Sequence, residues 1–143
     1  MSQNKPYFGR CIEDHPFVAM ARIVGAAATA ITQASLTGLT YRVDRYSSRD
    51  DAEQKQNGTE VVDDTALVVS DVIFNTLQTD NDWGADSTGY NFKSTIPASR
   101  FPTSHDASSN RQWYVVEVWC DPTSGDDFLG AEFILECHAT GKG

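Results

Sequence analysis

The chain has 143 residues, enough for one domain that buries roughly two thirds of the surface its unfolded form exposes. Twenty acidic residues against eleven Lys and Arg give a formal net charge of −9, which argues against nucleic acid or an anionic membrane surface as a partner. Apolar residues make up 40% of the chain, too many for a disordered protein, and charged residues interrupt them too often for a membrane-spanning helix.

The first sixteen residues show neither a strand period nor a helix period. They also lack the basic start and the apolar run of a secretory signal, so nothing in them predicts export. Tyr7, Phe8 and Ile12 lie there between prolines, and such a segment cannot build a core of its own. We expect residues 1–16 to form an extended arm, either disordered or docked on a neighbour, before a domain at 17–143.

Alternation of apolar and polar residues dominates the rest of the chain and predicts strands with one face in a core. In chain order, the expected strands lie at 17–24, 39–43, 66–69, 72–77, 90–96, 114–119 and 132–136. The Ala-rich patch between 25 and 34 fits a short helical turn or a loop, and polar clusters predict loops at 47–58, 79–88 and 103–110. About seven short strands separated by turn signals predict an antiparallel β-sandwich.

Two of these strands carry more specific expectations. In 90–96 the alternation places Asn91, Lys93 and Thr95 on the face in water. In 113–119 the face that carries Trp113 and Trp119 is too apolar for water, so we expect another sheet or another subunit to cover it.

The three cysteines, Cys11, Cys120 and Cys137, fit a reducing compartment better than a disulfide-stapled scaffold. The turn signals at 121–127 predict a hairpin that separates Cys120 from Cys137 along the ladder, so these two should not form a disulfide. Cys137 can meet Cys11 only if the arm runs beside the last strand.

Catalytic and cofactor motifs are missing. The sequence has no Gly-x-Ser-x-Gly elbow, no Gly-x-x-x-x-Gly-Lys phosphate loop and no His-Glu-x-x-His pair, and its adjacent acidic residues are typical of solubilising turns. We therefore expect no enzymatic activity and no cofactor.

Metal binding has two weak candidates. Asp80, Asp82 and Asp86 alternate as calcium ligands do, but the spacing matches an EF-hand loop only in part, which favours a solvated turn. A zinc site can be drawn from residues at the two chain ends, but adjacent strand residues point to opposite faces, so we expect no metal. The residues of that second set are Cys11, His15, Cys137 and His138.

The order of several segments carries a resemblance. These segments are Val18–Val24, Ile31–Val43, Ser70–Asp80, Gly89–Lys93, Ile96–Pro102 and Tyr114–Val118. In them the chain is similar to uncharacterised proteins of phage and prophage gene sets, and its layout resembles the immunoglobulin-like amino-terminal module of phage upper baseplate proteins. The resemblance covers residues 17–137, implies a virion component and points to no active residue.

The resulting hypothesis is an all-β, immunoglobulin-like antiparallel sandwich of about seven strands with an extended N-terminal arm. The protein would be a non-enzymatic structural protein of a tailed phage virion, as a capsid decoration or a neck, tail or baseplate accessory, made in the host cytoplasm. Its partners would be other capsid, neck or tail subunits and further copies of itself, with no nucleic acid and no membrane. The expected interface residues are Tyr7, Phe8, Ile12, Phe17, Trp113 and Trp119.

An alternative function rests on the aromatic residues. Trp83 and Tyr90 could stack on sugar rings, because a flat apolar ring buries much area at little entropic cost. The chain would then be a carbohydrate-binding module that aids host attachment.

Overall fold

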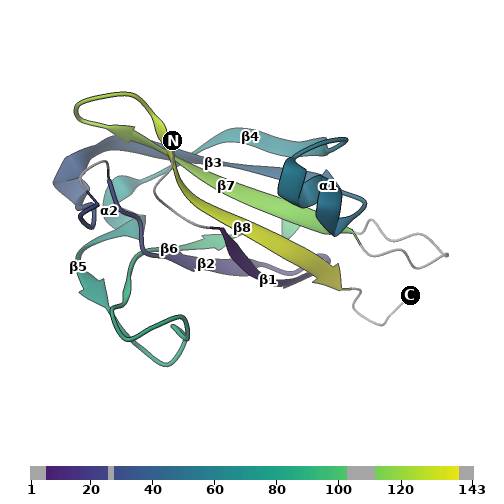
Figure 1. Cartoon of the computed structure of the whole chain (residues 1–143), viewed down its shortest axis with the longest axis horizontal. Coiled ribbons are helices and arrows are strands. Elements are labelled where there is room, and N and C mark those ends of the chain that lie inside the picture. Colours follow the sequence, from purple (N-terminus) through teal and green to yellow (C-terminus); the bar gives the residue numbers. More distant parts are fainter. Residues whose placement is uncertain (1–5, 26–27, 103–111, 139–143) are drawn as a thin grey trace.

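Two β-sheets packed face to face form the body of the molecule (Figure 1). The computed structural model describes residues 6–25, 28–102 and 112–138. Within them, one sheet has five strands in the order β1-β8-β7-β3-β4, and the other has three in the order β2-β6-β5. The strands are β1 (Tyr7–Ile12), β2 (Phe17–Ala21), β3 (Leu36–Tyr46), β4 (Thr59–Leu67), β5 (Ile73–Gln78), β6 (Tyr90–Ile96), β7 (Trp113–Pro122) and β8 (Phe128–His138).

The strand order is that of an immunoglobulin sandwich, in which strands B, E and D form one sheet and strands G, F, C and C′ belong to the other. Strands β2, β6 and β5 take the first set of positions, and β8, β7, β3 and β4 take the second. The Tyr114 hydroxyl donates to the Pro102 carbonyl over 2.9 Å, which resembles the tyrosine corner of that fold. The predicted all-β sandwich is confirmed.

The core lies between the sheets and follows the predicted alternation. Tyr114, Val116 and Val118 of β7 are fully buried, and so is Val43 of β3 opposite Val116. From the smaller sheet, β6 contributes Phe92, which is also fully buried. Every second side chain of these strands points between the sheets, which is why a period of two reveals them.

The N-terminal segment is part of the larger sheet as far as the structure describes it. Strand β1 pairs in parallel with β8, from Tyr7 opposite Phe133 to Ile12 opposite His138. The predicted arm therefore runs beside the last strand over this stretch, while residues 1–5 of it lie outside the described residues. The sequence of this strand shows no clear period because Gly9 and Arg10 interrupt the two apolar sides of a short edge strand.

The predicted loop at 47–58 contains helix α1 (Arg49–Gln54), so that expectation was wrong in part. Ser48 caps the helix by accepting a hydrogen bond from the Asp51 N–H over 3.1 Å, and Asp50 and Asp51 lie in its first turn, where carboxylates favour a helix. Only Ala52 of this helix is buried, so the sequence has no apolar stripe from which the helix could be predicted.

Helix α1 also corrects, at one end, the expected cover of the outer sheet face. Ala52 packs with Val115 and Ile134 on the outside of the five-stranded sheet, with Trp113 beside them. A short helix of the same chain therefore covers the Trp113 end of this face, where another sheet or another subunit was expected, whereas Trp119 at the far end is 38% exposed.

The stretch 59–72 also differs from the prediction. Strand β4 covers Thr59–Leu67, whereas the sequence predicted a strand only at 66–69, and α2 (Val69–Val72) takes up the end of that prediction. Strand β4 is an edge strand with register shifts opposite Val43 and a positive φ of 47° at Asp64, and these irregularities hide its period. Short 3-10 turns lie at Gln33–Ser35 and Ala98–Arg100, and the predicted loop at 103–110 falls outside the described residues. No helix in the described parts of the chain is long and apolar enough to cross a membrane.

Candidate functional site

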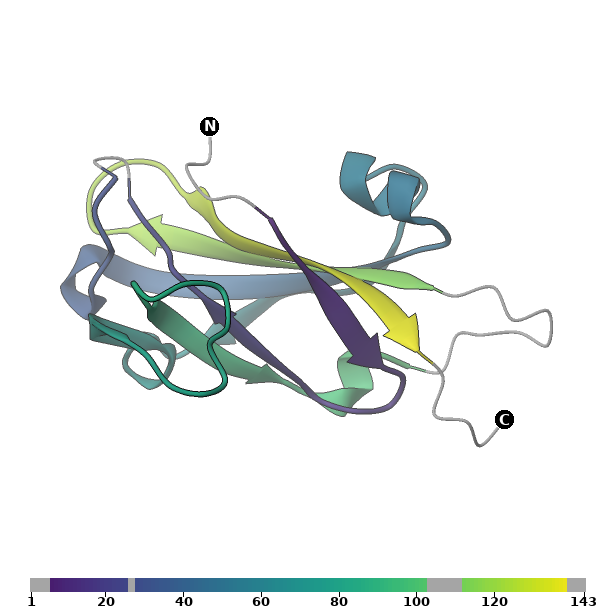
Figure 2. The same ribbon diagram turned by 60° about the horizontal axis from the view of Figure 1, so that its bottom comes forward.

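An apolar pocket opens where the edges of the two sheets meet. Strands β1 and β2 follow each other in sequence, and each is the edge strand of its sheet. The loop at 79–89, which joins β5 to β6, lies across the same side of the sandwich (Figure 2). Together these elements enclose a cavity of about 240 Å³. Its apolar lining includes Tyr7, Phe17, Val18, Trp83, Phe133 and Leu135.

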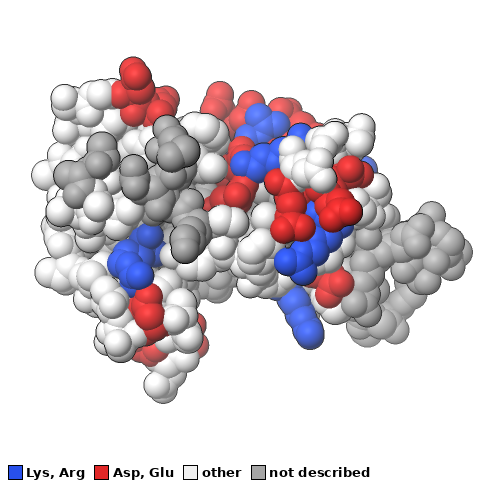
Figure 3. All heavy atoms as spheres, in the orientation of Figure 1, with Lys and Arg blue, Asp and Glu red and all other residues white. Residues whose placement is uncertain are grey.

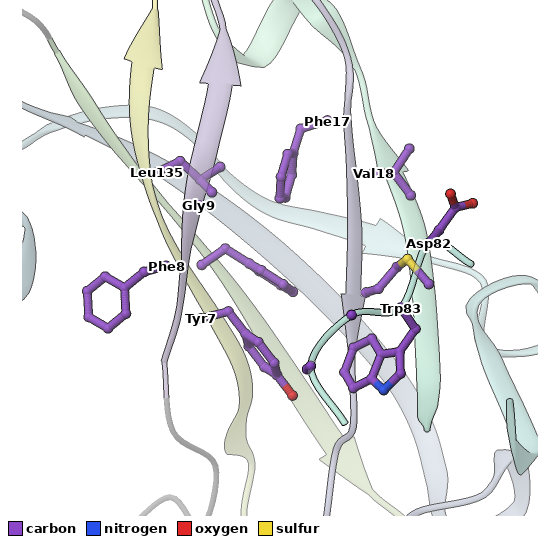
Figure 4. A pocket seen from close by; sticks show the side chains of 12 residues that line it. Tyr7, Phe8, Gly9, Phe17, Val18, Asp82, Trp83 and Leu135 are labelled. Carbon is purple, nitrogen blue, oxygen red and sulfur yellow. The ribbon is translucent and has the colours of Figure 1, made fainter. Parts of the chain in front are cut away.

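Aromatic rings form the walls of the pocket. Tyr7 stacks on Phe133 with ring centroids 5.4 Å apart, and its other neighbour is Trp83, which it meets edge-on at 6.2 Å. Phe17 meets Phe133 edge-on at 5.8 Å. Figure 4 shows the rings of Tyr7, Phe17 and Trp83 around one space, with the ring of Phe8 on the opposite side of β1. Such contacts order the walls before anything binds.

Hydrogen bonds to Asp86 hold the Trp83 loop in place. One carboxylate oxygen accepts from the indole Nε1–H of Trp83 and from the backbone N–H of Gly89, each over 3.0 Å. The other lies 2.7 Å from Nη1 of Arg22. The bonds from Gly89, Trp83 and Arg22, in that order of weight, hold the pKa of Asp86 well below its usual range. Asp86 is therefore ionised at neutral pH and ties the loop to β2's end.

A second carboxylate fixes the base of the loop. The Tyr90 hydroxyl donates to Asp80 over 2.6 Å, and this bond lowers the pKa of Asp80 and raises that of Tyr90 to about 12. The backbone N–H of Asp82 also donates to Asp80, over 2.9 Å. Asp80 and Asp86, weighed above as calcium ligands, thus accept hydrogen bonds from the loop itself.

Arg22 connects the loop to both edge strands, a role that no pattern in the sequence indicates. Its backbone N–H donates to the Tyr7 hydroxyl over 3.0 Å, and its guanidinium donates to the Gly89 carbonyl over 3.0 Å. Arg22 directly follows β2, so its backbone links this strand to β1 and its side chain, with the ion pair to Asp86, links it to the loop.

A second polar region covers the outer face of the five-stranded sheet. The Arg49 guanidinium lies 4.8 Å from the ring centroid of Phe8 and 5.9 Å from that of Trp113. Lys55, at the end of α1, contacts Glu117 at 2.6 Å and also contacts Glu132. Burial lowers the pKa of Lys55, but these two carboxylates outweigh it and leave the pKa raised.

Arg42 holds the neighbouring acidic residues on this face. It makes a two-pronged contact with Asp44 at 2.7 and 2.8 Å, which raises the pKa of Arg42, and lies within 4.0 Å of Glu60, Asp63 and Glu117. Figure 3 shows acidic and basic side chains interleaved on the side of the molecule that carries α1. Arg42 and Lys55 together contact five carboxylates, so this face is ion-paired but keeps a net negative charge, which is typical of a solvated surface.

The metal candidates are not assembled. His138 contacts Glu136 at 2.8 Å, and Nδ1 of His15 lies 2.8 Å from the Glu13 carbonyl. Cys11 and Cys137 face each other across β1 and β8. Among the residues that the structure describes, no group of three or more His, Cys, Asp and Glu is placed to hold a metal ion.

The predicted interface and stacking residues divide into three places. Tyr7, Phe17 and Trp83 meet in the pocket, while Tyr90 is only 4% exposed behind Trp83. On the outer side of β1, Phe8 and Ile12 are 52% and 46% exposed. Trp113 is half-buried beside Arg49, and Trp119 lies at the far end of β7.

The chain matches no protein-family model, no curated protein and no solved structure. Its fold defines it as an all-β sandwich domain with one open, apolar edge.

Proposed function

We propose that this chain is a non-enzymatic structural protein of a tailed phage virion, which binds neighbouring virion subunits through the open edge of its sandwich. The resemblance of residues 17–137 to proteins of phage gene sets supports a place in the virion. The edge surface, made of Tyr7, Phe8, Ile12, Phe17, Val18 and Trp83, supports assembly through this side.

The observation that carries the proposal is the position of the exposed apolar residues. Of the six large apolar side chains more than a third exposed among the described residues, Phe8, Ile12 and Val18 belong to the two adjacent edge strands. The Val18 side chain borders the pocket, and the Phe8 ring lies on the other side of β1. Apolar side chains gathered at an edge on an acidic chain are typical of a surface that another protein covers.

Edge strands also offer backbone groups to a partner. β1 pairs only with β8 and β2 only with β6, so one side of each strand has no strand partner in the described chain. An extended segment of another subunit can add to such an edge and place an apolar side chain in the pocket. Many copies in one particle would add avidity to a modest single contact.

The carbohydrate alternative keeps one supporting observation. Trp83 rims the pocket with part of its ring accessible, as a sugar-stacking residue must. Tyr90 is buried between Phe74 and Trp83, so a sugar could stack on its ring only after these neighbours moved. The geometry therefore favours assembly over glycan binding.

A matched pair of substitutions tests the proposal in particles from a host that carries the coding sequence. Val18→Glu places a charge on the edge surface, and Val68→Glu places the same charge on a valine that is 60% exposed elsewhere. We expect V18E to lower the copies per particle, counted by quantitative mass spectrometry, by at least about tenfold, because a carboxylate in an apolar contact costs well over 1.4 kcal/mol. V68E should change the count less than about twofold.

Two results would overturn the proposal: particles without this chain, or equal incorporation of the two variants. A saturable change of tryptophan fluorescence with host-surface polysaccharide, together with normal incorporation of V18E, would favour the carbohydrate-binding alternative.

A further inference from the structure

Two buried cysteines lie directly opposite each other on neighbouring strands. In the parallel pairing of β1 and β8, Cys11 is the register partner of Cys137. Both side chains point into the core, with exposures of 4% and 0%. Both are free thiols, and they hydrogen-bond to each other. The two sulfurs are therefore neighbours, although 126 positions separate the residues in the sequence.

The backbone geometry suits a disulfide. Neighbouring strands lie about 4.8 Å apart, and disulfides span Cα separations of roughly 4.4 to 6.8 Å. Side chains of register partners in a parallel pair leave the sheet on the same face, so the two Cβ atoms point the same way. The two strands end together and run in the same direction (Figure 2), so a bond here needs no large backbone movement.

We propose that Cys11 and Cys137 form an intramolecular disulfide when the protein meets an oxidising disulfide compound, and that this bond locks strand β1 onto β8. The chain is made with the thiols reduced, and the cross-link follows in an oxidising medium. This proposal does not depend on the proposed function. The disulfide would nevertheless fix Tyr7 and Gly9, which line the pocket, because both belong to β1.

The chemistry is thiol–disulfide exchange with a compound such as oxidised glutathione. The thiolate of Cys137 attacks one glutathione sulfur, forms a mixed disulfide and releases a first glutathione thiolate. The thiolate of Cys11 then attacks the Cys137 sulfur, forms the internal S–S bond and releases the second. Two electrons pass from the cysteines to glutathione, and the two thiol protons go to the released thiolates.

The surroundings determine which sulfur reacts first. The hydrogen bond between the thiols lowers the pKa of Cys137 and raises that of Cys11, so Cys137 is the first to ionise. Access comes from the position of β1 at the sheet edge, because an edge strand has one neighbouring strand and opens locally at a lower free energy than a central strand.

The third cysteine supplies the control. Cys120 is fully buried on β7, and its sulfur lies only 2.6 Å from the position that a Cβ on Gly130 would take. Burial raises the pKa of Cys120 to about 12, so this thiol stays protonated and inert. Cys120→Ser should therefore oxidise as the wild type does, whereas Cys11→Ser and Cys137→Ser should not.

The test compares the full chain in reduced and in oxidised glutathione. We expect the thiols titratable after denaturation to fall from three to one, and a digest without reductant to contain a peptide that links Cys11 to Cys137. The cross-link closes almost the whole chain into a loop and should raise the Tm on the order of 10 °C. C11S and C137S should lose this rise, and C120S should keep it.

Other outcomes would overturn the proposal. They are three thiols that persist in excess oxidised glutathione, a bond that includes Cys120, or a chain that carries glutathione without an internal bond. If C11S or C137S fails to fold, the thiol count and the linked peptide of the wild-type chain still decide.

Discussion

Asn91 offers the sharpest test of how the smaller sheet is held together. Strand β2 ends at Ala21, opposite Phe92 of β6. Asn91 precedes Phe92 on β6 and, because the strands are antiparallel, lies just beyond the end of β2. Its side-chain oxygen accepts from the Ile23 N–H over 2.7 Å, and its amide donates to the carbonyls of Ile23 and Ile31 over 2.9 and 3.1 Å. The side chain thus continues the pairing after the backbone of β2 has left the sheet.

The magnitude follows from the groups that Asn91→Ala would leave without a partner. The Ile23 carbonyl keeps a second bond from the Ile31 N–H at 3.1 Å, so the Ile23 N–H and the Ile31 carbonyl are the groups at stake. Asn91 is 1% exposed and both isoleucines are buried, so water does not replace the lost bonds. At about 1–3 kcal/mol for each of these two orphaned groups, we expect a loss of about 2–6 kcal/mol of unfolding free energy.

Urea denaturation followed by circular dichroism measures this loss, and Asn75→Ala is the matched control. Asn75 also accepts one backbone hydrogen bond, from the Gln33 N–H at 2.8 Å, but at an exposed position. Its substitution should cost less than about 1 kcal/mol, because water can replace the lost bond. A loss below 1 kcal/mol for N91A, or equal losses for the two variants, would refute this account of the sheet.

Three further predictions concern the hydrogen bond of Tyr114 and the loop at 79–89. Tyr114→Phe removes one buried hydrogen bond and should cost about 1–1.5 kcal/mol in the same denaturation assay. Gly89→Ala should lower the Tm in thermal melts far more than Gly125→Ala. Both glycines have a positive φ, at 108° and 99°, but only at Gly89 would a Cβ clash with the backbone of β5. Because hydrogen bonds hold the pKa of Asp86 below its ordinary value of 3.8, its contribution to stability is complete above about pH 4 and is lost as the pH falls below that. Asp86→Asn should therefore lower the Tm at pH 7 and leave a smaller difference at pH 2; a difference independent of pH would contradict the assignment.

The sequence predicted the strands whose two faces differ. The bounds of β6 agree with the predicted 90–96, and the alternations of β3, β7 and β8 place the core residues correctly, because each strand packs one apolar face inward. Asn91 broke this rule. The prediction placed it in water, and it is buried because it completes backbone hydrogen bonds that no period can reveal.

The elements that were missed have no strong period to detect. Strand β4 is an edge strand with a bulge, and its buried side places Val61 and Val62 next to each other, which conceals the alternation. Helix α1 has one buried residue, Ala52, so only its capping serine and its acidic first turn could have revealed it.

The pocket was beyond sequence reasoning because its walls come from distant segments. Tyr7 and Trp83 meet only because β1 pairs in parallel with β8 and because a loop of the other sheet folds over the same edge. Aromatic composition identified both residues as binding candidates, but it did not bring them together. The role of Arg22 depends on that same meeting and could not be inferred without it.

The pocket and the thiol pair depend on one structural element. Strand β1 supplies the Tyr7 ring to the pocket and the Cys11 sulfur to the thiol pair, and it is attached to the sheet along one side only. An edge strand opens at a lower free energy than a central one, so the pocket wall and access to the thiols are governed by the same local equilibrium. A partner that binds only when β1 is docked must then favour the conformation in which the two sulfurs touch, and a disulfide must favour the conformation that binds the partner.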